Sequence, residues 1–226
     1  MYCKRFGIDA KIPCYKTASK AVKIPTKEKL RMFIANASDN LATQLTLSME
    51  AGLRPIELCN LRVKDVDLEQ KLVYPATAKH GSSRTLKISQ SLTAMLQTHI
   101  IQNNLSPDNK LFAQNAKAYG KNFRNMRNNL AKKLSDQTLH QIRLYDFRHY
   151  FATSTYDKTK DILYVKQQMG HKRIETTLIY IQLINLNDDE WTCKTAKDLN
   201  EVSQLVEAGF EYVTEMDGIK VFRKRK

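Results

Sequence analysis

Cysteine is scarce in the sequence, and its four copies form no pattern that suggests a disulfide framework or a zinc site. They lie far apart, without a CxxC pair or the spacing of Cys and His ligands, at Cys3, Cys14, Cys59 and Cys193. Disulfide-dependent secreted domains carry denser cysteine, whereas free cysteines are normal in a reducing compartment. We therefore expect a cytoplasmic protein without a structural metal ion.

Long apolar segments are also missing. No stretch approaches the roughly 20 apolar residues of a membrane-spanning helix, and the N-terminus lacks the apolar core of a signal peptide. The sequence contains neither a P-loop nor an acidic cluster with metal-ligand spacing. We expect no membrane partner, and neither a nucleotide nor a metal cofactor.

Acidic residues are too few to balance the basic ones. The chain has 37 Lys+Arg against 23 Asp+Glu, a formal net charge of +14. Residues 110–133 carry seven basic side chains and no Asp or Glu, whereas residues 185–217 carry nine acidic ones against two lysines. Basic excess favours a polyanion such as DNA, because each neutralised phosphate releases counterions. The polarised charge predicts DNA-binding stretches followed by an acidic tail with a different role.

Apolar periodicity and capping residues predict a mainly helical protein. We expect helices over residues 27–36, 39–51, 55–61, 91–103, 117–134, 145–156, 162–169, 175–183 and 196–207. Three short strands are predicted around residues 63–68, 72–74 and 85–88, with turns at 69–71 and 80–83. A Met-Asp-Gly turn between residues 212–213 and 219–222 indicates a hairpin near the C-terminus. The fold class is mainly α with a small three-stranded antiparallel sheet.

Breaks in these patterns divide the chain into three parts. Residues 1–25 are basic, contain two prolines and show no periodicity, so they are expected to be an arm or linker. Residues 26–184 form the main domain, and residues 185–226 form a helix and hairpin tail. The arm is too short for a helical DNA-binding domain of its own.

Two of the candidate site residues come early in the chain. Arg54, in Ala-Gly-Leu-Arg-Pro-Ile-Glu-Leu, lies between a helix end and a helix start, where a guanidinium can reach a phosphate beside free backbone N–H groups. Lys79, in Thr-Ala-Lys-His-Gly-Ser-Ser-Arg, is expected at the tip of the second hairpin of the small sheet. Taken alone, each also fits an ordinary solvated surface residue.

The other candidates come from two later segments. In Leu-Tyr-Asp-Phe-Arg-His-Tyr-Phe-Ala-Thr, Tyr145 and Arg148 lie three residues apart and share one face of the predicted helix. In the next segment, His171 follows a helix stop at Gly170, and Tyr180 lies on the following helix. Tyr180 also fits an ordinary buried tyrosine, and as a nucleophile its phenol needs activation by nearby cations or a base.

The order and spacing of these segments resemble one family closely. An Arg after a Gly-Leu helix break, a hairpin Lys, an Arg-His pair before Ala-Thr, and Gly-His nine residues before a Tyr are similar to tyrosine recombinases, or phage-type integrases. Residues 25–184 match the catalytic domain of that family in order. The tail, Glu-Ala-Gly-Phe-Glu-Tyr-Val-Thr-Glu followed by Phe-Arg-Lys-Arg-Lys, resembles integrases of archaeal mobile elements.

The resemblance assigns roles to residues of this chain. It implies that Arg54 and Arg148 bind the phosphate, that Lys79 is the general acid, that His171 adds a hydrogen bond, and that Tyr180 is the nucleophile. Tyr145 stands where most members have a His, and we expect it to contact the active site without being the general acid. Further DNA contacts are expected from Arg84, His149, Lys121, Arg124 and Arg127.

The implied function is a site-specific DNA recombinase that uses a 3′-phosphotyrosine intermediate, needs neither metal nor ATP, and assembles as a dimer or tetramer on double-stranded DNA. Two alternatives stay open: a type IB-like topoisomerase, and a catalytically weak DNA-binding fragment. The tail has an amphipathic helix with Leu199, Val202, Leu205 and Val206 on one face. We expect it to contact another protomer, with packing against its own domain as the alternative.

Overall fold

Capping residues set the bounds of the first three helices. The computed structural model describes residues 24–76, 83–185, 191–216 and 218–225. The Thr26 side chain accepts a hydrogen bond from the Lys29 N–H at the start of α1 (Lys27–Ala35). Helix α2 (Asp39–Ala51) ends at Gly52, whose φ of 58° is left-handed, and Pro55 opens α3 (Pro55–Asn60). These three helices were predicted from the sequence.

The small sheet is shorter than predicted. Strands β1 (Val66–Asp67), β2 (Leu72–Val73) and β3 (Leu86–Lys87) pair antiparallel in the order β1-β2-β3. Residues 63–65, expected to start the first strand, form the 3-10 helix η2 (Val63–Asp65), since Asp65 accepts the backbone N–H of Arg62 and tightens the chain there. The turn expected at residues 80–83 lies largely outside the described residues.

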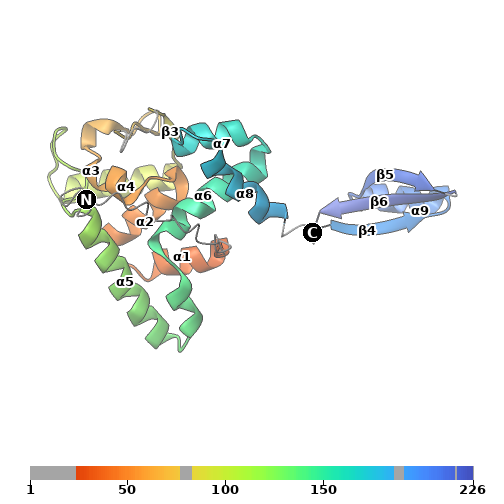
Figure 1. Ribbon diagram of the computed structural model, residues 1–226, viewed down its shortest axis with the longest axis horizontal. Helices are drawn as coiled ribbons and strands as arrows, with labels where there is room; N and C mark the ends of the chain where they lie inside the picture. The colour runs from red at the N-terminus through yellow and green to blue at the C-terminus, as the bar shows by residue number, and fades with distance from the viewer. Residues whose placement is uncertain (1–23, 77–82, 186–190, 217, 226) are drawn as a thin grey trace, which may run out of the picture.

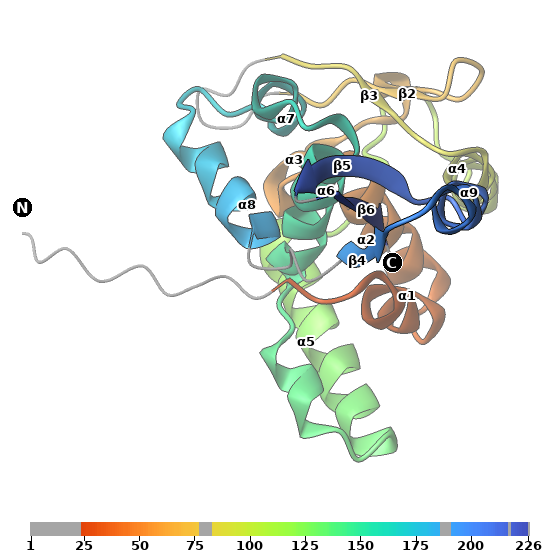
Figure 2. The same ribbon diagram turned by 90° about the vertical axis from the view of Figure 1, so that its right-hand side faces the viewer.

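Five further helices follow, close to the predicted positions. They are α4 (Gln90–Gln102), α5 (Ala116–Lys133), α6 (Leu144–Thr159), α7 (Ile162–Met169) and α8 (Glu175–Asn185), with the 3-10 helix η3 (Gln137–Gln141) before α6. Helix α5 and the η3–α6 segment run back along each other and project from the helical body (Figures 1 and 2). In the described part of the chain, no helix has the length and apolar character needed to cross a membrane.

Two hydrophobic clusters meet along α6. The larger cluster joins α1 to α5 and the small sheet, and its fully buried member from α6 is Phe147. The smaller cluster joins α6, α7 and α8 through Ala152, Val165, Met169 and Tyr180. Because α6 contributes to both, residues near its middle lie at the junction of the two clusters. Any polar group buried at this junction needs hydrogen-bond partners from several elements.

The tail forms a second sheet, of which the sequence analysis predicted the hairpin of β5 and β6 but not the strand β4. Strand β4 (Trp191–Ala196) pairs with β6 (Ile219–Arg225), which also pairs with β5 (Glu211–Met216), and α9 (Leu199–Glu207) connects β4 to β5. Ala196, expected to start a helix, instead ends β4, since it pairs with Lys220. Figure 1 shows this unit apart from the helical body.

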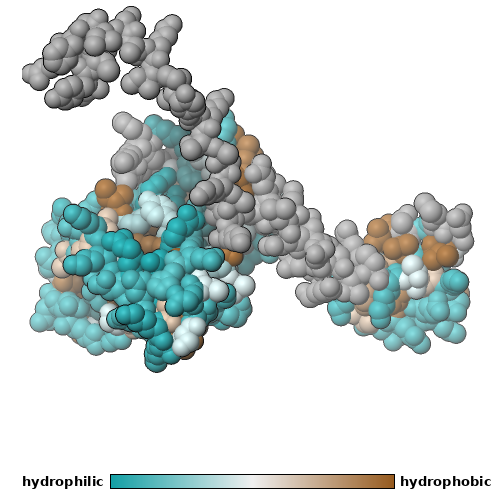
Figure 3. Space-filling view, turned by 60° about the horizontal axis from the view of Figure 1, so that its bottom comes forward, coloured by the Kyte–Doolittle hydropathy of each residue, from teal (hydrophilic) through white to brown (hydrophobic). Residues whose placement is uncertain are grey.

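The apolar stripe of α9 is divided between the unit's own core and its surface. Leu205 and Val202 pack with Ala196, Phe210 and Phe222. Leu199 and Val206 are 75% and 56% exposed. On the face drawn in Figure 3, hydrophobic residues of the tail unit lie beside hydrophilic ones. The contact with another protomer stays a prediction.

Candidate active site

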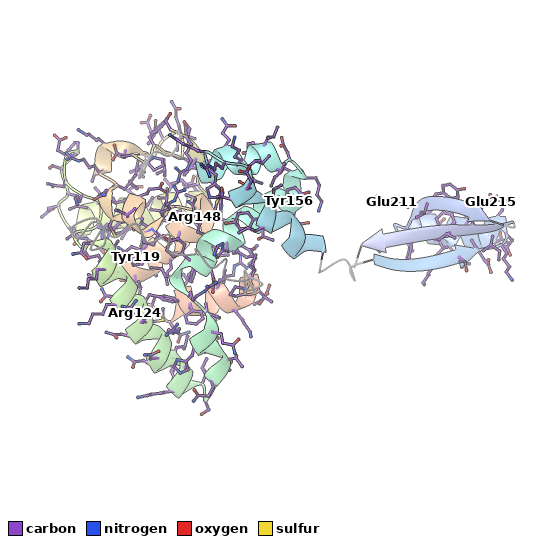
Figure 4. All side chains as sticks on the ribbon, in the orientation of Figure 1. Tyr119, Arg124, Arg148, Tyr156, Glu211 and Glu215 are labelled. Carbon is purple, nitrogen blue, oxygen red and sulfur yellow. The ribbon has the colours of Figure 1, made fainter. Side chains whose placement is uncertain are left out.

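Arg148 lies buried at the junction of the two clusters. Its side chain projects from α6 inside the helical body (Figure 4) and the residue is 4% exposed. One terminal nitrogen, Nη1, donates to the carbonyl oxygen of Gly52, and the other, Nη2, donates to the carbonyl oxygen of Met169 at 2.7 Å. The guanidinium thus connects the ends of α2 and α7. Burial lowers the pKa of Arg148 to about 10, and nearby Arg54 acts in the same direction. The group therefore stays cationic at neutral pH.

The carboxylate of Glu57 contacts both arginines that were predicted to bind the phosphate. Glu57 is 2% exposed on α3 and accepts the backbone N–H of Arg54 at 2.9 Å. Its Oε1 also pairs with Nη1 of Arg54 at 2.6 Å, and its Oε2 lies 3.9 Å from Nη1 of Arg148. Arg54 and Arg148, 94 positions apart in sequence, therefore meet at one carboxylate. Such a pair of guanidinium groups suits the charge of a phosphate.

A third arginine, Arg84, binds the same carboxylate. Nη2 of Arg84 donates to Oε2 of Glu57 at 2.7 Å, and neither side chain is exposed. Burial alone would raise the pKa of Glu57, but the hydrogen bond from Arg84 and those from Arg54 lower it below its ordinary value. Glu57 is therefore ionised at neutral pH. The DNA contact expected from Arg84 stays a prediction, since this conformation buries its guanidinium.

Gly170 makes room for Arg84. A Cβ at this position would lie 2.6 Å from Nη1 of Arg84, and the φ of 62° is left-handed. Glycine is thus required both by the turn that ends α7 and by the guanidinium behind it. Nε and Nη1 of Arg84 are buried without a hydrogen-bond partner among the described residues.

His171 follows this turn and faces Arg148. Its Nε2 lies 3.2 Å from Nη2 of Arg148, and its Nδ1 lies 3.0 Å from the Thr177 hydroxyl. Because an arginine can only donate, Nε2 is the acceptor and Nδ1–H donates to Thr177. Burial and the charge of Arg148 lower the pKa of His171 to about 4. The imidazole is therefore neutral at pH 7.

Tyr180 lies on α8 next to the second residue of the Arg-His pair. Its hydroxyl is 3.1 Å from Nδ1 of His149, and the Tyr180 residue is 2% exposed. Burial raises the pKa of the phenol, although Arg148 and Arg54 act to lower it. Burial also lowers the pKa of His149. A neutral phenol thus meets a neutral imidazole.

A basic groove of about 960 Å³ opens beside these residues. Its wall consists of Arg54, the start of α3, α5, and the first part of α6, which includes His149. No Asp or Glu is among its described lining residues, and its cations are Arg54, Lys117, Arg124, Arg127 and Arg143. Figure 4 shows Arg124 on α5 at the edge of the body. This groove is the candidate DNA-binding surface.

The remaining predicted residues are placed as follows. Tyr145 is 47% exposed in the groove wall, with its ring centroid 6.5 Å from that of His149. Lys121 is exposed on α5 but is not among the described lining residues. Arg127 lines the groove and donates to the Ile142 carbonyl oxygen at 2.9 Å. Lys79 lies outside the described residues.

The sequence analysis gave no role to two residues that organise the site, Glu57 and Thr177. Glu57 stands three residues after Arg54, the spacing at which a helix-capping carboxylate reaches back to the first backbone N–H. That spacing was a usable signal. Thr177 is fully buried and orients His171, and its distance of six residues from that histidine gave no comparable signal.

Metal binding was not expected from the sequence. Among the residues that the structure describes, no group of three or more His, Cys, Asp or Glu side chains is arranged to hold a metal ion. Independence from metal and ATP stays a prediction.

Comparison with protein families matches residues 21–186 to the Phage integrase family. The chain therefore belongs to this family, that of the tyrosine-type site-specific recombinases, as its motifs predicted.

Curated relatives carry the same family name. The chain is 26% identical over 223 residues to the tyrosine recombinase XerA of Pyrococcus horikoshii, an alignment that covers 91% of this chain and 71% of the relative. It is 28% identical over 184 residues to a tyrosine recombinase of Pseudothermotoga lettingae, covering 79% of this chain and 59% of that one. This chain thus spans only part of the length of these relatives. Relatives from archaea are consistent with the predicted archaeal affinity, whereas the likeness to mobile elements stays a prediction.

Solved structures share the fold. The crystal structure of XerA recombinase matches with a TM-score of 0.61 at 20% identity, covering 88% of this chain and 70% of that chain. The Tn1549 transposon integrase, solved in complex with transposon right end DNA, matches with a TM-score of 0.62 at 17% identity, covering 77% and 67%. The predicted catalytic-domain fold is therefore confirmed.

Proposed function

We propose that the chain is a site-specific DNA recombinase that cleaves and rejoins DNA through a covalent 3′-phosphotyrosine on Tyr180. One observation carries the proposal: Arg54, Arg148 and His171 converge around a buried carboxylate, with the Tyr180 hydroxyl nearby. Two guanidinium groups and an imidazole can stabilise a phosphate, and a phenol can attack it, without a metal ion.

The reaction follows from the chemistry of these groups. The Tyr180 oxygen attacks phosphorus, the bond from phosphorus to the 5′-oxygen breaks, and the negative charge that builds on the non-bridging oxygens is stabilised by Arg54 and Arg148. Lys79 is the proposed donor of the proton that the leaving 5′-oxygen takes up. The 5′-hydroxyl of a partner strand then attacks the phosphotyrosine and restores the phenol. The phosphotyrosine conserves the energy of the broken bond, so no ATP is needed.

DNA binding must change the contacts seen without it. Phosphate oxygens accept hydrogen bonds only, whereas Nε2 of His171 accepts one from Arg148. Phosphate binding therefore requires a proton on Nε2, through protonation or a change of tautomer. Tyr180 is buried and must also be exposed before it can attack, a change that partner binding commonly induces.

Double-stranded DNA and further copies of the chain are the proposed partners. The groove supplies five cations beside the site, and similar folds were solved on DNA, including a lambda integrase dimer bound to a core site with a TM-score of 0.55. Self-association on DNA would bring two cleaved strands together for exchange.

Covalent trapping from a random pool tests this function and finds the target site in the same experiment. The protein is incubated with duplexes of randomised sequence, each nicked so that the short fragment released with a free 5′-hydroxyl diffuses away and cannot be rejoined. Trapped complexes are isolated under denaturing conditions and their DNA is sequenced. We expect one enriched sequence for the wild type and none for Tyr180→Phe, which loses only the phenol oxygen.

The outcomes separate the alternatives. Exchange between two duplexes that carry the enriched sequence supports a recombinase. Relaxation of a supercoiled plasmid without exchange indicates a topoisomerase. DNA binding by the wild type without any trapped adduct indicates a binding fragment and contradicts the proposal.

A further inference from the structure

We infer that His149 is the general base that removes the proton from the Tyr180 hydroxyl, a catalytic role beyond the DNA contact expected from the sequence. The inference rests on the proposed function, in which Tyr180 is the nucleophile. It starts from the hydrogen bond between Nδ1 of His149 and the phenol oxygen, 3.1 Å long. A general base must lie about 2.6–3.2 Å from the atom whose proton it takes, and this pair meets that requirement.

Tyr180 needs such a base. A free phenol has a pKa of about 10, and burial raises the pKa of Tyr180 above its ordinary value despite the opposing effect of Arg148 and Arg54. The fraction of phenolate at neutral pH is therefore small. Proton removal has to accompany the attack on phosphorus, because spontaneous ionisation supplies too little nucleophile.

His149 is in a suitable state to accept the proton. Burial lowers the pKa of its imidazole, as do Arg143 and Arg148, while Asp146 acts in the opposite direction. The ring is therefore neutral at pH 7, and the tautomer with its proton on Nε2 leaves a lone pair on Nδ1 for the phenol.

The surroundings of the ring explain where the proton goes. Tyr180 faces it from α8, and Tyr145 lies beside it on its own helix. The ring also lines the groove, together with Arg54, Arg124 and Arg127. His149 thus connects the buried phenol with the DNA-binding surface. These cations disfavour a lasting imidazolium, so the acquired proton is held only until it returns or leaves through the groove.

Other candidates for the base are less well placed. His171 uses Nε2 to accept from Arg148 and pairs Nδ1 with Thr177. Tyr145 stands where most members of the family have a histidine, and a phenol is a poor proton shuttle near neutral pH. The histidine that follows Arg148 therefore lies where an imidazole can serve the nucleophile directly.

The balance of the step is complete. In cleavage, the phenol O–H bond breaks and its proton moves to Nδ1 while the bond from oxygen to phosphorus forms. The leaving 5′-oxygen takes a proton from the general acid. In rejoining, an incoming 5′-hydroxyl gives its proton to the deprotonated general acid and attacks phosphorus, and the departing phenolate recovers its proton from Nδ1 of His149.

The test compares His149→Asn with the wild type in single-turnover cleavage of the duplex enriched from the randomised pool. Asparagine can keep the hydrogen bond to the phenol but cannot accept a proton near neutral pH. We expect cleavage of the bound duplex to slow by about 10²–10⁴-fold, a much larger effect than any loss of affinity from the DNA contact expected of His149. His140→Asn, at an exposed histidine of η3, is the matched control and should cleave at the wild-type rate.

A modified duplex distinguishes base from acid. Sulfur in place of the bridging 5′-oxygen leaves without protonation, so a variant that lacks the general acid recovers, whereas His149→Asn stays slow. With His149→Ala, added imidazole should restore part of the rate. In the wild type, the rate on this duplex should fall as the pH drops below 6.5, the ordinary value of a histidine pKa, and His149→Asn should lose this dependence.

The failure of this inference differs from failure of the proposed function. A wild type that forms no adduct contradicts the recombinase assignment itself. An active wild type with His149→Asn cleaving at an equal rate, or recovering on the sulfur duplex, overturns the role of His149 alone. If His149→Asn does not fold, the wild-type pH profile decides, and a rate that does not fall at any pH below 6.5 at which the protein stays folded contradicts a histidine base.

Discussion

The carboxylate of Glu57 holds two guanidinium groups close enough to bind the same phosphate. It contacts Arg54, Arg84 and Arg148, and both Glu57 and Arg84 are buried. Removing one member of a buried ion pair leaves an uncompensated charge, which costs roughly 3–5 kcal/mol. We therefore expect Glu57→Gln to lower the free energy of unfolding by about that amount in urea denaturation. Glu207→Gln, at an exposed position of α9, should change it by less than about 0.5 kcal/mol.

A double variant separates stability from catalysis. Adding Arg84→Met to Glu57→Gln removes the stranded guanidinium, so part of the lost stability should return. Cleavage should be impaired in both the single and the double variant, because Arg54 and Arg148 lack their shared carboxylate in both. If the two substitutions are additive in stability, Glu57 and Arg84 do not form the pair described.

Tyr145 stands where most members of the family have a histidine, and substitutions there test whether this position still transfers a proton in this chain. Its side chain is about half exposed and pairs with the ring of His149 rather than with Arg148. Tyr145→Phe keeps the ring and should reduce cleavage only modestly, and Tyr145→His should be tolerated. Tyr164→Phe, at an exposed tyrosine of α7, provides the control. A loss for Tyr145→Phe as deep as that of Lys79→Ala would show that the phenol carries the proton.

Single residues of the site were partly predictable. Arg54, Arg148, His171 and Tyr180 could be expected near one another because their spacing resembles a family, and their roles stay predictions. The meeting of Arg54, Arg84 and Arg148 at Glu57 could not be identified, because a buried ion network depends on which elements pack together. His149 was expected at the DNA, and only the three-dimensional structure places its Nδ1 beside the Tyr180 hydroxyl.

The break between α2 and α3 positions the site at the scale of secondary-structure elements. Gly52 has a φ of 58°, its carbonyl oxygen accepts from Arg148, and a Cβ there would lie 2.2 Å from the ring of Phe151. Gly52→Ala should lower stability by at least roughly 1–2 kcal/mol from the left-handed backbone alone, and should slow cleavage because α6 has to move. Thermal unfolding and single-turnover cleavage measure the two effects.

Gly120→Ala is the matched control. Gly120 lies within α5 and an added Cβ would meet only the end of the Arg124 side chain, at 3.4 Å. Alanine is the better helix former by about 1 kcal/mol, so this variant should be as stable as the wild type or more so. Equal stabilities for Gly52→Ala and Gly120→Ala would contradict the requirement for glycine at residue 52.

Helices were easier to predict than strands. The bounds of α7 agree with the prediction, since Asp161 caps it and Gly170 ends it, and both signals are local. Strand β4 was missed because its partner, β6, lies about 30 positions further along the chain and no adjacent turn marks the pairing. The strands of the small sheet are two residues each, too short for alternation to define their ends.

At the scale of the whole molecule, the tail unit has a hydrophobic cluster of its own, separate from the two clusters of the helical body. We propose that residues 185–226 mediate contact between protomers. Deleting residues 186–226 should leave a folded monomer that binds one site and fails to assemble cooperatively on paired sites. Circular dichroism, analytical ultracentrifugation and gel shifts measure these properties. An unfolded or insoluble truncated protein would mean that the tail belongs to the domain core.

Point variants of α9 sharpen that test. Serine at the exposed positions, in the double variant Leu199→Ser and Val206→Ser, should weaken assembly without unfolding the tail. Leu205→Ser should disrupt the tail itself, because Leu205 is buried in its cluster. If the double variant assembles as well as the wild type, the exposed side chains of Leu199 and Val206 are not part of the interface.

The central claim is that Tyr180 forms the covalent bond to DNA, and mass spectrometry of the trapped complex tests it most directly. The trapped adduct is digested with protease and nuclease, and the peptide that retains a nucleotide is sequenced by fragmentation. The account predicts a single modified peptide from α8 with the nucleotide attached through its 3′-phosphate to Tyr180. A nucleotide attached to any other residue, or an adduct that persists in Tyr180→Phe, would contradict it.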